Sequence, residues 1–338
     1  MIKIDYKHRH SAHCENGVTA GLLSHHGLEI SEAMVFGIGS GLFFGYAPFI
    51  KIGNQPLTTY RIMPGLIFKK AAKRLGVKYY SRRFRDQNES MTAVDDKLKD
   101  GIPVACQTGA YWLPYFPESM RFHFNAHNIV IYGKDGDTYM VSDPIMDKPT
   151  TIERKSLLES RYAKGTMAPK GKIYYPTKVV PEVDLRPGIL KAIKETCFNM
   201  LSIPFACAGT RGIKFLSKRL RKWPERMGAK KASRYLGSVI RMQEEIGTGG
   251  AGFRFIYGAF LQECAEILQE EKLNQISNEF TDVGDLWREF ARLGARNCKA
   301  RAEATESYDH LGDLLIECAS REEALFKRLR KIIKRTKL

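Results

Sequence analysis

The hydrophobic pattern of the chain changes near residue 176. The first part mixes strands, which are short runs of β-branched and aromatic residues, with helices. We predict strands at 42–49, 78–84, 103–108, 128–132, 138–141 and 172–175, and helices at 18–28, 31–36, 63–74 and 91–99. The second part has helical spacing only, and we predict helices at 188–201, 212–222, 229–246, 253–271, 274–304 and 308–333. The sequence thus predicts an α+β domain at 1–178 and an all-α helical domain at 185–338, with a proline-containing linker between them.

Cys14 stands just before the first predicted helix. Unpaired N–H groups and the helix dipole favour a thiolate at such a position, and the thiolate is the nucleophilic form of cysteine. Cys14 is therefore our candidate nucleophile. The alternative is a core residue, which is the commoner role of a lone cysteine in a buried helix.

His127 and Asp143 lie at neighbouring ends of a predicted hairpin. His127 begins the strand before the turn residues 135–137, and Asp143 follows the returning strand. An antiparallel hairpin brings such ends side by side, so Asp143 could hold the imidazole while its other nitrogen faces Cys14. The alternative is a strand-start histidine and an aspartate that caps the turn at Pro144.

Two blocks of sequence resemble a known family. Residues 13–46, HCENGVTAGLLSHHGLEISEAMVFGIGSGLFFGY, are similar to the family named for the N-terminal domain of butirosin biosynthesis protein H. Residues 247–268, GTGGAGFRFIYGAFLQECAEIL, resemble the helical domain that commonly follows it. The order of Cys, His and Asp also resembles papain-like folds, especially bacteriocin-processing cysteine peptidases. The family resemblance implies a papain-like acyltransferase that moves an acyl group from a carrier-protein thioester to an amine.

The same resemblance directs attention to the oxyanion hole. Papain-like enzymes use the N–H of the nucleophile and a side-chain donor six residues before it. His8 takes that position here in place of glutamine, and an imidazole N–H can also donate. His10 and His13 are neighbours that leave the identity of the donor open.

Two further segments are candidates for contacts with the acyl donor. Tyr111 and Trp112 belong to the aromatic loop 111–116, which could line an acyl or pantetheine channel or pack against the sheet. Gly249 and Gly250 precede a helix that starts near Arg254, where N–H groups and a guanidinium could bind the phosphopantetheine phosphate. A tight turn between helices is the alternative.

The chain is strongly basic, with a formal net charge of +17 over 338 residues. Basic residues concentrate at 69–85, 214–234 and 327–337. Such charge could attract nucleic acid, an anionic membrane surface or an acidic protein. No nucleic-acid-binding motif accompanies it, which argues against nucleic acid. If the family resemblance holds, the partner is an acidic acyl carrier protein.

The remaining features set limits on chemistry and location. Seven scattered cysteines form no CxxC pair, which argues against disulfides and a metal site. We expect no tightly bound cofactor, since phosphopantetheine would arrive on the donor. The sequence shows no apolar run of membrane-spanning length and no signal-peptide pattern, so we expect a cytoplasmic protein, with contact to a membrane surface left open.

Three functions remain after these observations. The first is acyl transfer from a carrier-protein or coenzyme A thioester to an amine or hydroxyl of a small-molecule or lipid acceptor in secondary metabolism. The second is hydrolysis by a cysteine peptidase or amidase. The third is a binding module in which Cys14 is unreactive.

Overall fold

The computed structural model describes residues 1–52, 54–299 and 307–336, and it divides into two compact units. Unit 1 comprises residues 1–35 and 71–183, and unit 2 comprises residues 36–70 and 184–338. The expected domains of 1–178 and 185–338 therefore need one correction, because residues 36–70 belong to the second unit. The predicted helix 274–304 is observed as α11 (Lys272–Cys298), and its last expected residues, 300–304, lie outside the described residues.

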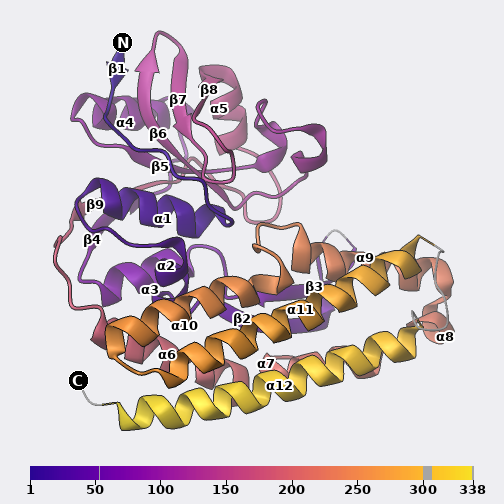
Figure 1. The fold of residues 1–338 in the computed structure, drawn as a ribbon. Helices are drawn as coiled ribbons and strands as arrows, with labels where there is room; N and C mark the ends of the chain where they lie inside the picture. Colours follow the sequence, from indigo (N-terminus) through magenta and orange to yellow (C-terminus); the bar gives the residue numbers. More distant parts are fainter. Residues whose placement is uncertain (53, 300–306, 337–338) are drawn as a thin grey trace. The chain divides into compact units, whose positions relative to one another are not determined.

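Unit 1 is built on an antiparallel sheet with the order β4-β9-β5-β6-β7-β8, and β1 also pairs with β6 (Figure 1). Its strands are β1 (Ile2–Lys3), β4 (Lys78–Arg82), β5 (Val104–Thr108), β6 (His127–Asp135), β7 (Thr138–Ser142), β8 (Thr150–Glu153) and β9 (Ile173–Lys178). Its helices are α1 (Cys14–His25), α4 (Gln87–Lys99) and α5 (Arg154–Arg161), together with the start of α2 (Glu32–Ile38) and the end of α3 (Leu66–Arg74). Of these elements, β1, β8 and α5 were not predicted from the sequence.

The two faces of this sheet serve different purposes. Ile129 and Ile131 of β6 join the core cluster that contains Met91, Val94 and Leu98 of α4. Since successive side chains of a strand point to opposite faces, the alternate residues of β6 point the other way. Helix α1 contacts β6 and β9, so it covers this second face near Cys14.

Unit 2 is helical around one hairpin, β2 (Leu42–Ile52) and β3 (Gln55–Arg61), as Figure 1 shows. The helices are α6 (Arg186–Leu201), α7 (Gly209–Leu220), α8 (Trp223–Met227), α9 (Ala229–Glu244), α10 (Arg254–Leu268), α11 and α12 (Tyr308–Arg335). From residue 184 onward, the described residues contain no strand, although Ala208 bridges to Gly45 of β2. Thus the helical prediction holds for the described part of the C-terminal sequence, whereas unit 2 as a whole is not all-α.

Two glycines allow close packing of residues 36–70, one against the C-terminal helix α10 and one within the segment itself. A Cβ on Gly37 would lie 2.0 Å from the Phe260 ring of α10, and one on Gly39 would lie 2.6 Å from Ile67. Only glycine permits such close approach without a shift of the neighbours. These glycines therefore serve packing, and no local sequence pattern reports which helix they meet.

A buried ion pair lies inside unit 2. The Arg254 guanidinium donates to both carboxylate oxygens of Glu322, at 2.8 and 3.0 Å, and both side chains are fully buried. Trp287 Nε1 donates to the same carboxylate at 2.7 Å, and Arg254 Nη1 donates to the Gly252 carbonyl. These bonds tie the start of α10 to α11 and α12.

Among the described residues, no helix is both long and apolar enough to cross a bilayer.

This ion pair generates a stability prediction. Glu322→Gln should destabilise the protein by about 3–5 kcal/mol, because Arg254 would remain buried without its countercharge. The matched control is Glu317→Gln on the same helix, where Glu317 pairs with Arg321 at the surface, and it should cost about 1 kcal/mol or less. Urea unfolding of both variants measures the difference. Equal losses would contradict the structural role of the buried pair.

Candidate active site

The start of α1 is held by side chains on both sides of Cys14. His13 is the N-cap residue, and its Nδ1 accepts a hydrogen bond from the Asn16 N–H at 3.4 Å. Glu32 of α2 accepts from the N–H groups of Ala12 and His13, at 2.9 and 2.7 Å. The turn before Cys14 is thus fixed by a carboxylate that the sequence analysis did not single out. Cys14 itself is only 5% exposed.

Gly17 allows α1 to approach the segment that follows Asp143. A Cβ at Gly17 would lie 2.5 Å from Pro144 Cβ and 2.7 Å from Ser11. The Ser11 N–H also donates to the Pro144 carbonyl at 2.6 Å. The chain on either side of the helix start is therefore packed directly on the residue after Asp143, which brings the thiol to the end of the hairpin.

His127 and Asp143 form a buried pair at this end of the sheet. His127 Nε2 lies 2.7 Å from Asp143 Oδ2, and the two residues are 3% and 0% exposed. Tyr115 Oη donates to the same Oδ2 at 2.9 Å, and the Ile145 N–H donates to Oδ1 at 3.2 Å. The ring of Phe116 packs against the imidazole with 5.3 Å between centroids. The carboxylate therefore has donors on both oxygens.

Cys14 contacts the other side of the imidazole. Burial alone would lower the pKa of His127, but the charges of Asp143 and Cys14 and their hydrogen bonds to the ring raise it to about 10. Because Nε2 is bonded to Asp143, Nδ1 is the nitrogen available to the thiol. The structure thus brings Cys14, His127 and Asp143 together.

His8 does not occupy the position expected of an oxyanion donor. Its Nδ1 lies 2.8 Å from Ser142 Oγ, and its Nε2 lies 3.0 Å from the Met146 carbonyl. With Nε2–H donating to that carbonyl and Nδ1 accepting from the serine, the neutral ring has no N–H left for a substrate. The contacts correct this expectation: His8 fastens the N-terminal segment to the residues around Asp143.

The two alternatives to His8 are also engaged elsewhere. His10 is exposed and lies 3.8 Å from the surface carboxylate of Asp147, while His13 caps α1 through Nδ1. Their contacts thus provide no support for an oxyanion role. In papain-like enzymes the oxyanion donor lies six residues before the nucleophile. That spacing does not identify the donor here, because the path of the chain before α1 directs the His8 side chain to Ser142 and Met146.

The aromatic loop lies partly at the site. Tyr111 and Trp112 are 43% and 41% exposed, and Tyr111 stacks on His123 with 4.3 Å between ring centroids. The contacts to the candidate catalytic residues come instead from Tyr115 and Phe116, which the sequence analysis saw only as part of this loop. A substrate contact by Tyr111 or Trp112 stays a prediction.

The glycine-rich segment before α10 has a structural role. Gly249 and Gly250 have φ values of 66° and 83°, and the Gly250 N–H donates to Thr248 Oγ1 within the turn. Arg254 is fully buried against Glu322. The expected contact of Arg254 with a phosphate is therefore wrong, since its guanidinium is already bonded inside unit 2, and the tight-turn alternative accounts for the glycines.

In the part of the chain that the structure describes, no group of three or more His, Cys, Asp and Glu side chains is arranged to hold a metal ion. The site consists of one buried thiol, one imidazole and one carboxylate from three separate segments. This arrangement is that of a cysteine-dependent enzyme.

Comparisons with known proteins place the chain in a family. Residues 13–144 match the model of butirosin biosynthesis protein H, N-terminal, and residues 155–329 match a domain of unknown function, DUF4872. Residues 13–144 therefore belong to the family of butirosin biosynthesis protein H, N-terminal, and the longer C-terminal match places the chain among proteins that carry the DUF4872 domain. No curated protein matches the sequence.

Several solved structures resemble part of the chain. One of them is the crystal structure of a candidate C39-like peptidase from Bacillus anthracis, with 15% sequence identity and a TM-score of 0.37. The similarity covers 53% of this chain and 100% of that chain. A resemblance at this level carries no argument about activity.

The pairing of His127 with Asp143 makes stability depend on pH. Because the pKa of folded His127 is about 10 and its ordinary value is 6.5, the stabilisation is complete below pH 6.5 and is lost as pH rises through about 10. Asp143→Asn removes one charge that raises this pKa. We expect the variant to titrate His127 at lower pH by NMR, and to lose more stability at pH 6 than at pH 10.

A matched control is Asp147→Asn, which alters a carboxylate that is 91% exposed four residues further on. Urea unfolding of both variants at the two pH values provides the comparison. If Asp143→Asn behaved like Asp147→Asn at both pH values, the buried pair would not control the His127 proton.

Proposed function

We propose that this protein is an acyltransferase that moves an acyl group from an acyl carrier protein or coenzyme A thioester, through Cys14, to an amine or hydroxyl of a small-molecule or lipid acceptor. The observation that carries this proposal is the contact of Cys14 with an imidazole that Asp143 holds. Membership in the family of butirosin biosynthesis protein H favours transfer in a biosynthetic pathway of secondary metabolism over protein hydrolysis.

The residues divide the reaction into two steps. In the first, Cys14 Sγ attacks the thioester carbonyl, a new thioester bond forms, and the donor thiolate leaves with the proton of the His127 imidazolium. In the second, the neutral imidazole takes a proton from the acceptor amine or hydroxyl as it attacks the acyl-enzyme. The Cys14 thiolate then leaves and the imidazolium is restored. Asp143 keeps the ring in position throughout.

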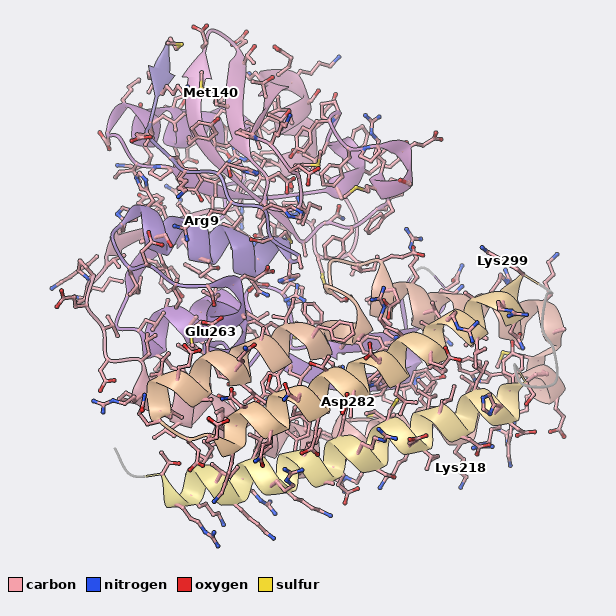
Figure 2. The ribbon with its side chains drawn as sticks, in the orientation of Figure 1. Arg9, Met140, Lys218, Glu263, Asp282 and Lys299 are labelled. Atoms are coloured by element: carbon pink, nitrogen blue, oxygen red, sulfur yellow. The ribbon has the colours of Figure 1, made fainter. Side chains whose placement is uncertain are left out.

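The basic composition supports an acidic carrier as the donor. Part of the positive charge is neutralised within unit 2, since Arg221 pairs with Asp309 and Asp313. Lys218 and Lys222 beside it are exposed, and Figure 2 shows Lys218 at the outer surface. Lys69 and Lys73 on α3 are exposed as well. These two lysine pairs, one in each of two basic segments, are candidates for the surface that attracts the carrier.

The covalent step is tested by acyl loading of the purified full chain. Incubation with acyl-loaded carrier proteins should add the mass of the acyl group, and peptide mapping should place it on Cys14. Cys14→Ala should abolish the adduct and lower transfer by several orders of magnitude, since the nucleophile is gone. Full transfer by Cys14→Ala would dismiss the covalent mechanism. Loss of the acyl group to water, with an acceptor present, would indicate a hydrolase.

The carrier as partner is tested by salt. The rate of loading from an acyl carrier protein should fall steeply between tens and hundreds of millimolar salt, because exposed charges are screened over about 10 Å at 0.1 M. Loading from a small thioester should change little, and this donor controls for effects of salt on the thiol or the fold. Lys218→Glu with Lys222→Glu, or Lys69→Glu with Lys73→Glu, should slow only the carrier-bound donor. Equal salt dependence for both donors would exclude electrostatic recruitment.

A further inference from the structure

A second side chain from β6 reaches the Cys14 sulfur. Asn128 follows His127 and points to the face of the sheet that α1 covers, opposite to Ile129 and the α4 core. Its Nδ2 lies 3.9 Å from Cys14 Sγ, and the residue is 6% exposed. Thus the strand that begins with the imidazole also places a carboxamide beside the thiol.

The orientation of this carboxamide is determined at both ends. Nδ2 donates to the Ala126 carbonyl at 3.0 Å, and Oδ1 accepts from Tyr174 Oη at 3.0 Å. The carbonyl of Ala126 can only accept, so the amino group must lie on that side. Burial raises the pKa of Tyr174 well above its ordinary value, so its hydroxyl stays protonated and can donate. The remaining N–H of Asn128 therefore faces the sulfur.

This N–H is a donor without a good acceptor. A nitrogen-to-sulfur distance of 3.9 Å is at the far limit of a hydrogen bond, so the sulfur satisfies this N–H poorly. Buried donors in folded proteins are nearly always paired, and exceptions call for an explanation. A substrate oxygen beside the sulfur would supply the acceptor.

The backbone offers a second donor at the same place. Cys14 is the first residue of α1, and the first N–H groups of a helix have no carbonyl partner within it. When Cys14 Sγ attacks a carbonyl carbon, the electron pair of the C=O π bond moves to oxygen, which becomes an oxyanion adjacent to Sγ. When the intermediate collapses, the pair returns and the leaving group departs. Donors about 2.7–3.1 Å from that oxygen stabilise it.

We propose that Asn128 is the side-chain donor of the oxyanion hole of Cys14, and that Tyr174 is the residue that positions it. The inference rests on the proposed acyl chemistry of Cys14. It assigns to β6 the donor that the sequence analysis sought before α1, and it makes one strand supply both the base and the oxyanion donor.

Two reagents that react with the Cys14 thiol can distinguish a role of Asn128 in oxyanion binding from a role in thiol reactivity or folding. p-Nitrophenyl acetate acylates Cys14 through a tetrahedral oxyanion, whereas iodoacetamide alkylates it at a saturated carbon without one. Asn128→Ala should lower the acylation rate by about a hundredfold or more and change the alkylation rate by less than about threefold. Asn128→Leu, which keeps the volume of the side chain but has no N–H, should behave in the same way. Rates are taken for the peptide that contains Cys14, with Cys14→Ala as background.

The role of Tyr174 in positioning Asn128 is tested with the same two reagents. Tyr174→Phe should lower acylation by about tenfold with alkylation retained, because the amide is present but free to turn. Asn125→Ala is the matched control: this asparagine is also buried, but its Nδ2 donates to the Lys164 and Thr166 carbonyls. It should leave the ratio of acylation to alkylation unchanged.

Three results would overturn the assignment. One is a parallel loss of both rates in the Asn128 variants, which would mean that Asn128 acts on the thiolate or the fold. Another is unchanged acylation. The third is an unsubstituted protein that p-nitrophenyl acetate does not acylate at Cys14. Failure of the proposed function looks different, because the ester would then acylate Cys14 while carrier thioesters and acceptors would not react.

Discussion

The burial of an imidazole against a carboxylate is the interaction on which the candidate site depends. Removing a carboxylate from water is costly unless its oxygens keep hydrogen-bond donors. Asp143 retains three, from His127, Tyr115 and the Ile145 N–H. Its charge in turn raises the pKa of His127 against the effect of burial, together with that of Cys14. This buried, hydrogen-bonded pair therefore keeps the imidazole beside the sulfur protonated well above its ordinary pKa.

The geometry of this pair depends on how the helix start is fastened to the sheet. Gly17 lets α1 approach Pro144, His8 bonds to Ser142 and the Met146 carbonyl, and Glu32 holds the N–H groups of Ala12 and His13. Each contact joins the segment around Cys14 to another part of unit 1. A small displacement of the thiol would cost reactivity, so residues that never touch substrate help to define the site.

Local patterns predicted the three central residues but not their surroundings. Cys14 before a helix and His127 and Asp143 at hairpin ends are positions that short stretches of sequence reveal. Tyr115 and Asn128 escaped because nothing local shows that a loop side chain reaches Asp143, or that a strand residue next to His127 faces α1. His8 was assigned by an offset borrowed from other enzymes. Likewise, the membership of residues 36–70 in unit 2 follows from contacts between distant segments.

A count of charged residues does not show which cations are free to attract a partner. Arg254, counted as a free cation near a glycine turn, is bonded to Glu322 in the interior of unit 2. Lys214 pairs with Glu323 and Arg328 with Glu279, so part of the basic character of α7 and α12 is neutralised by neighbouring helices. Steering of an acidic partner depends on the cations that remain exposed and unopposed, and on their distance from one another relative to the screening length. The net charge of +17 therefore favours an anionic partner in general. The exposed lysines at the end of α7 and on α3 are two defined candidates for the docking surface, and each can be tested by substitution.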